Sequence, residues 1–116
     1  MRQHLAAVLF AAAFLASPAA AAPDQTQGVS LMSAHVSEDG ALSGGAGAVS
    51  AERISTGAYA VVFDRATAGC AKVVNVGLNF ANVAAIANPN AFTVFVRSPD
   101  GLPTDHGFEM IVFCPR

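Results

Sequence analysis

The two cysteines are the first residues whose type suggests a specific chemistry, the formation of a disulfide. Cys70 and Cys114 are the only cysteines in the chain, so one pairing is open to them. A redox motif would need Cys-x-x-Cys spacing, and a metal site would need further cysteines or a cluster of histidines. A bridge would close a loop of about 45 residues, whose chain entropy is worth about 4 kcal/mol. We therefore expect a structural disulfide between Cys70 and Cys114.

A second candidate for chemistry is the pair Asp105 and His106, which lies beside Gly107 in a segment bounded by proline and glycine. These residue types, placed on a loop, are those of acid–base and metal sites. Adjacent side chains seldom converge on one ion without a distant third ligand, and the spacing of His35 does not mark it as that ligand. The preferred interpretation makes Asp105 a turn residue whose carboxylate accepts hydrogen bonds from local backbone N–H groups. Asp105 and His106 stay weak candidates for a loop site, and no metal or cofactor is expected.

The remaining motifs give little support to catalysis. No Gly-x-Ser-x-Gly motif occurs, and a chain with no Trp and one Tyr lacks the aromatic platforms of glycosidases. That tyrosine, Tyr59, is expected to pack its ring in the core and to find one partner for its hydroxyl. The segment Gly44-Gly45-Ala46-Gly47 is not followed by Gly-Lys-Ser/Thr, so we interpret it as a flexible connector or the entrance to a strand. We expect a protein that is not an enzyme.

The N-terminal segment has the pattern of a signal peptide. A short, positively charged start precedes an apolar run at residues 5–16, which is too short to span a bilayer of about 30 Å. Ser17-Pro18 then breaks the helix, and small residues lead to a predicted cleavage between Ala21 and Ala22. The chain is therefore expected to be secreted, to the periplasm or the medium, with no membrane segment in its mature form. The predicted parts are a signal peptide (1–21), a flexible tail (22–28) and a single domain (29–116).

The composition narrows the class of protein further. The whole chain is 53% hydrophobic and 12% charged, with a net charge of −2. Without the predicted signal peptide the hydrophobic share falls to about 48%, which is ordinary for a globular domain, whereas the charge stays low. Such a chain is too apolar to remain disordered. It also has too few basic residues to bind nucleic acid through a basic surface.

Periodicity predicts strands throughout the domain. Residues alternate with period 2 in the clearest segments, and Gly and Pro turn signals recur about every 8 to 14 residues. We predict an all-β fold, a small antiparallel β-sandwich of about six to eight short strands. The clearest strands are 59–63, 70–76, 92–97 and 108–114, and the weaker ones are 29–36, 46–50 and 82–87, the last of which could instead form a short helix.

Three of these strands are apolar on both faces. If Tyr59, Phe92 and Phe108 begin the faces that point into the core, the residues between them point outward. In a two-layer sandwich that second face should meet water and carry charge. Two interpretations stay open: loops or the N-terminal strand cover the second face, or it binds another subunit or a partner. The candidate interface residues are Val62, Phe95, Ile111 and Phe113.

The strand motifs also carry a resemblance. The order Gly-x-Tyr-x-Val-x-Phe at 57–63, Cys-Ala at 70–71, Val-x-Val at 94–96 and Phe-x-Met-x-Val-x-Cys at 108–114 resembles small secreted bacterial β-rich proteins of unassigned function. It is distantly similar to the tip domains of phage tail fibres and of collagen-like surface proteins. The resemblance covers residues 46–114 and implies a β-rich fold, with trimerisation common among such tips. It supplies no catalytic residue, and this chain has no collagen repeat or coiled-coil stalk.

Together these observations favour a secreted, disulfide-bridged β-sandwich that acts as an interaction or surface module. The alternatives are a glycan- or receptor-binding domain that uses the loop at 98–107, a small inhibitor of an extracellular enzyme, and, least favoured, a hydrolase. The expected partners are a second copy of the chain or an extracellular protein or glycan.

Overall fold

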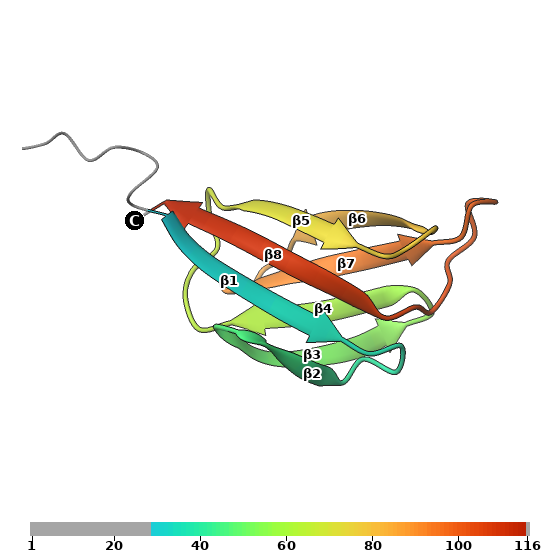
Figure 1. Ribbon diagram of the computed structural model, residues 1–116, viewed down its shortest axis with the longest axis horizontal. Coiled ribbons are helices and arrows are strands. Elements are labelled where there is room, and N and C mark those ends of the chain that lie inside the picture. The colour runs from blue at the N-terminus through green and yellow to red at the C-terminus, as the bar shows by residue number, and fades with distance from the viewer. Residues whose placement is uncertain (1–28, 116) are drawn as a thin grey trace, which may run out of the picture.

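The computed structural model describes residues 29–115, which form two stacked antiparallel sheets (Figure 1). Sheet A has the strand order β2-β1-β8-β5, and sheet B has the order β3-β4-β7-β6. The strands are β1 (Val29–Val36), β2 (Leu42–Ala46), β3 (Ala48–Ser55), β4 (Ala58–Phe63), β5 (Ala71–Asn75), β6 (Phe80–Ala85), β7 (Ala91–Arg97) and β8 (Phe108–Pro115).

The predicted fold class is confirmed. The chain is all-β over residues 29–115, with eight strands and no helix in that range. The segment predicted at 82–87 overlaps β6, which begins two residues earlier and ends at Ala85, and the alternative of a short helix there is wrong. The predicted signal peptide (1–21) and tail (22–28) lie outside the described residues.

The glycine-rich segment is where the predicted boundaries fail. Gly44 to Ala46 belong to β2, so the connector interpretation is wrong. Gly47 alone carries the chain from sheet A into β3 of sheet B. Its φ is 77°, and a Cβ at this position would lie 3.0 Å from Met32 Cγ, so only glycine fits without strain. The strand predicted at 46–50 therefore joins the end of one strand to the start of the next.

The core lies between the inner faces of the four central strands, two from each sheet. Tyr59 packs edge-to-face on Phe108 with 5.3 Å between ring centroids, and Phe63 packs on Phe92 with 6.2 Å. The Tyr59–Phe108 pair joins the two sheets, because β4 belongs to sheet B and β8 to sheet A, whereas Phe63 and Phe92 link the neighbouring strands β4 and β7 within sheet B. The core residues of these strands are Met32, Ala34 and Val36 of β1, Tyr59, Val61 and Phe63 of β4, Phe92, Val94 and Val96 of β7, and Phe108, Met110, Val112 and Cys114 of β8.

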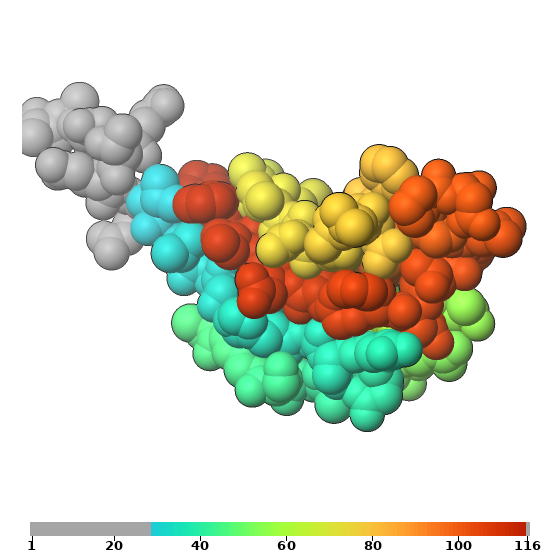
Figure 2. Space-filling view, turned by 45° about the vertical axis from the view of Figure 1, so that its right-hand side comes forward, coloured from blue at the N-terminus to red at the C-terminus, as the bar shows by residue number. Residues whose placement is uncertain are grey.

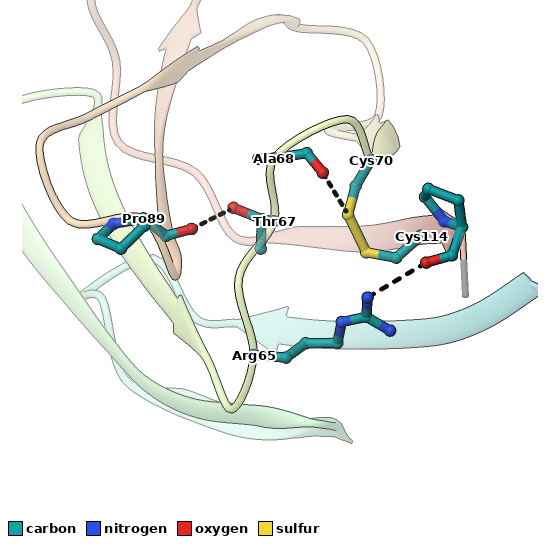
Figure 3. Close-up of a disulfide and its surroundings, with 7 residues drawn as sticks. Arg65, Thr67, Ala68, Cys70, Pro89 and Cys114 are labelled. Carbon is teal, nitrogen blue, oxygen red and sulfur yellow. Dashed lines mark hydrogen bonds between the residues drawn. A yellow bond between two sulfur atoms is a disulfide. The ribbon is translucent and has the colours of Figure 1, made fainter.

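The predicted disulfide is confirmed between Cys70 and Cys114 (Figure 3). Cys70 ends the crossover from β4 to β5, and Cys114 is fully buried near the end of β8. Beside the bridge, the Arg65 guanidinium donates to the Pro115 carbonyl at 3.2 Å, and the Thr67 hydroxyl donates to the Pro89 carbonyl at 3.0 Å. The bridge and the Arg65 hydrogen bond hold the long crossover against the end of the last strand, and the Thr67 hydrogen bond joins it to the β6–β7 loop.

Candidate functional site

The outer face of sheet A carries a row of exposed apolar side chains. In the strand register Leu31 of β1 lies beside Phe113 of β8, and Val73 of β5 lies beside Ile111 of β8. The exposed fractions are 61% for Leu31, 59% for Val73, 41% for Ile111 and 42% for Phe113. The strands that present them lie side by side in Figure 2, with β1 in cyan, β8 in red and β5 in yellow. We call this surface the apolar face of sheet A: Val29, Leu31, Val73, Ile111 and Phe113.

Polar groups border the apolar face at both of its ends. At one end the next row of the sheet consists of His35, Glu109 and Asn75. His35 Nδ1 lies 3.5 Å from Glu109 Oε1. At the other end, next to Val29, the Pro115 carbonyl accepts the hydrogen bond from Arg65. An apolar centre with a polar rim is the usual anatomy of a protein–protein interface.

The four interface residues predicted from the sequence do not share one surface. Ile111 and Phe113 lie on the apolar face of sheet A, whereas Val62 and Phe95 lie on the outer face of sheet B. Phe95 is 38% exposed and Val62 is half-buried. The cross-strand neighbours around Val62 are small or polar, since Val62 pairs with Ser50 and Ala91, and Ala60 in the next row pairs with Glu52 and Thr93. The middle of sheet B therefore presents smaller side chains than the apolar face of sheet A, and its large exposed apolar residues Phe80 and Phe95 lie toward one end.

The idea that the N-terminal strand covers the second apolar face is wrong for the described residues. β1 lies within sheet A, hydrogen-bonded to β8 along its whole length, and does not lie over it. β1 instead extends the surface, because it contributes Val29 and Leu31. Sequence reasoning did not single out these two residues or Val73. The alternating pattern along 29–36 could have identified Val29 and Leu31, since it places them on the face of the strand opposite to that of Met32 and Ala34.

Asp105 joins the β7–β8 loop to the β3–β4 turn through hydrogen bonds. Its Oδ1 accepts the N–H of Gly57 at 2.8 Å, and its Oδ2 accepts Arg53 Nε–H at 2.9 Å. Gly57 lies in the β3–β4 turn, so the backbone group that Asp105 satisfies is distant in sequence, not local as expected. The Arg53 guanidinium, followed by the Gly57 N–H, holds the pKa of the Asp105 carboxyl below its usual value.

Tyr59 joins the same network from the core. Its hydroxyl donates to the Glu38 carbonyl at 2.7 Å and accepts the backbone N–H of His106 at 3.2 Å. Burial is the main cause that raises the pKa of Tyr59, so the phenol stays neutral. The carboxylate and the phenol are both occupied by hydrogen bonds that join loops. This arrangement stabilises the end of the sandwich, and the lowered pKa makes the Asp105 carboxylate a weaker base.

The His106 side chain points away from this network. Its Nδ1 lies against the Gly107 carbonyl, and the residue is exposed. His106, His35 and Glu109 line one shallow hollow of about 320 Å³ at the polar end of the apolar face. The structure thus brings His35 and His106 to one hollow, which their spacing had not indicated. Over residues 29–115 no three His, Cys, Asp or Glu side chains are grouped closely enough to hold a metal ion.

These observations define the class: a disulfide-bridged antiparallel β-sandwich with one strongly apolar outer face. Comparisons with family models, with curated proteins and with solved structures found no match. None of the elements seen between residues 29 and 115 is a helix long and apolar enough to cross a membrane.

Proposed function

We propose that the chain is an exported, non-catalytic interaction module that binds a partner protein through the apolar face of sheet A. The observation that carries the proposal is the exposure of Leu31, Val73, Ile111 and Phe113 in adjacent rows of one sheet. Contiguous apolar surface of several hundred Å² on a soluble domain is commonly a binding site. The polar groups at both ends of the face fit the rim of such a site.

Export is supported by the signal-peptide pattern of residues 1–21 and by the disulfide. Disulfides persist in oxidising compartments and are rare in the cytosol of mesophiles. A domain that works outside the cell also gains from a covalent bridge, because such domains are small and have limited cores.

The loop at 98–107 gives less support to the two alternatives that would use it, a hydrolase and a glycan-binding domain. A hydrolase would need Asp105 as a base, but its two oxygens hold Gly57 and Arg53, and these contacts lower its pKa and so its basicity. A glycan site in the loop at 98–107 would need an aromatic platform, and that loop has none. We therefore favour a protein partner over a sugar.

The test is photo-crosslinking from the centre of the apolar face during export from the producing cell. A crosslinking residue replaces Ser33, which lies beside Ile111 in the sheet. A specific adduct is expected, and Leu31→Ser or Phe113→Ser should reduce its yield at least about tenfold, since each removes a large apolar contact.

The matched control is Leu102→Ser, which removes an equally exposed leucine (62%) from the β7–β8 loop. That variant should keep the adduct. An adduct that survives Leu31→Ser and Phe113→Ser, or the absence of any adduct, contradicts the proposal. Thermal melts of each variant separate loss of binding from loss of fold.

A further inference from the structure

The four edge strands of the sandwich are not equally protected against pairing with another strand. β2 is short and carries a bulge against β1, and β3 has two register shifts against β4. β5 carries Lys72 on its inner side, with Nζ 4.6 Å from the centroid of the Phe92 ring. Bulges, short strands and inward-pointing lysines are the devices by which native sheets block edge-to-edge association.

β6 has none of these devices. Its six residues, Phe-Ala-Asn-Val-Ala-Ala, include no charge and no proline, and its register against β7 is unbroken from Phe80 to Ala85. Large apolar side chains stand exposed at both ends of the strand, with 63% of Phe80 and 39% of Ile86 accessible. Among the described strands only β7 pairs with it.

The hydrogen bonds of β7 show which groups of β6 face the open edge. Val96 donates its N–H to Gly57 at 2.7 Å and accepts the N–H of Thr104 at 3.1 Å, so its polar groups point away from β6. Since these groups alternate along a strand, those of Phe95 and Thr93 point toward β6 and meet Asn82 and Ala84. The N–H and C=O groups that face the open edge are therefore those of Ala81, Val83 and Ala85.

We infer that the β6 edge pairs with the β6 edge of a second copy of this chain, antiparallel about a two-fold axis at Val83. In this register Ala81 exchanges two hydrogen bonds with the partner's Ala85, and Val83 with the partner's Val83. Phe80 then lies opposite the partner's Ile86 on the outer face. Aromatic and β-branched residues form favourable cross-strand pairs.

A second copy fits this edge better than an unrelated peptide for two reasons. The segment from Leu78 to Ile86 has no charge, so two copies meet without repulsion. In this register every edge-facing N–H and C=O group meets a partner, and the exposed Phe80 of each copy also lies against the exposed Ile86 of the other copy. A two-fold interface requires such self-complementarity.

The dimer has a consequence for the apolar face of sheet A, and this step rests on the proposed function. The two-fold axis of an antiparallel strand pair runs perpendicular to the sheet, so sheet B continues across both copies. Both copies of sheet A then lie on the same side of that sheet. The two apolar faces point in one direction, which allows bivalent binding with increased avidity.

The inference is tested on the chain expressed with its own N-terminal segment and purified after export. Light scattering should give twice the monomer mass, and the amides of Ala81, Val83 and Ala85 should exchange slowly at high concentration and faster on dilution. Ala81→Pro removes an edge-facing N–H that no bond within sheet B uses, so it should give a folded monomer.

A second variant keeps the test decisive if the proline disturbs folding. Position 82 is exposed in the monomer, and Asn82→Lys places two lysines diagonally across the axis, so it should weaken dimerisation about two- to fivefold, and less at high salt. Asn82→Gln is its uncharged control and should leave the dimer intact. Phe113→Ser should also leave it intact, although it should reduce the crosslinking tested above.

Three results would overturn the inference. They are a monomer at the highest soluble concentration, slow exchange of the three amides that does not depend on concentration, and a dimer that Phe113→Ser weakens and Asn82→Lys leaves unchanged. Only the third also concerns the proposed function, because it would make the apolar face of sheet A a self-association surface.

Discussion

At the scale of single residues, the Tyr59 hydroxyl joins the core to two loops. It donates to the Glu38 carbonyl and accepts the His106 N–H, and the residue is fully buried. Tyr59→Phe keeps the ring against Phe108 but leaves both backbone partners without the hydroxyl. We expect a loss of about 1–2 kcal/mol in the free energy of unfolding, measured in urea. A loss below about 0.5 kcal/mol would mean that water replaces the hydroxyl.

Asp105 should make the stability depend on pH. Its pKa is lowered in the folded protein, chiefly by Arg53, so the ionised carboxylate stabilises the fold. This stabilisation is complete above the unfolded value near 3.8 and is lost as the pH falls through the lower folded pKa. Asp105→Asn should therefore be less stable than the wild type at pH 6, and the gap should shrink toward pH 2. Urea titrations across this range measure the gap.

At the scale of the elements, the β3–β4 turn depends on Gly57. Gly57 and Gly101 both have positive φ, 71° and 87°. A Cβ on Gly57 would lie 2.6 Å from the Val96 carbonyl oxygen and 2.9 Å from the Thr104 nitrogen, whereas a Cβ on Gly101 meets nothing within 4 Å. We expect Gly101→Ala to cost about 1–2 kcal/mol and Gly57→Ala about 3 kcal/mol or more, measured by thermal or urea unfolding. Equal losses would show that the turn can move away from β7.

The strands differ in how well the sequence predicts them, for a physical reason. β4, β7 and β8 match the predicted segments to within one residue at each end, because β-branched and aromatic residues alternate along them. β2 and β3 were missed as separate strands. Gly44 and Gly45 lack side chains that could show alternation, and a corner made by the single residue Gly47 leaves no polar loop between the strands.

At the scale of the whole molecule, the candidate site depends on topology that local patterns do not contain. Val62 and Ile111 each point outward from a strand whose other face is buried, and their sequence patterns are alike. They lie on opposite sides of the sandwich because β4 belongs to sheet B and β8 to sheet A. Strand pairing between segments far apart in the chain decides which sheet each strand joins. The sequence therefore predicted that an apolar outer surface exists, but not which residues make it up. Asp105 was misjudged for the same reason, since its partner Gly57 is 48 residues away.

The disulfide acts on the whole molecule, because it ties the crossover between the two sheets to the last strand. Replacing Cys70 and Cys114 together by Ala should lower the free energy of unfolding by about 4 kcal/mol, since the unfolded chain is then no longer constrained by a closed loop. Urea unfolding of this variant and of the reduced wild type should agree. Thiol titration of the denatured, non-reduced protein should find no reactive thiol. Two reactive thiols would mean that the bridge does not form, and the buried Cys114 would then stabilise the core only as a small apolar side chain.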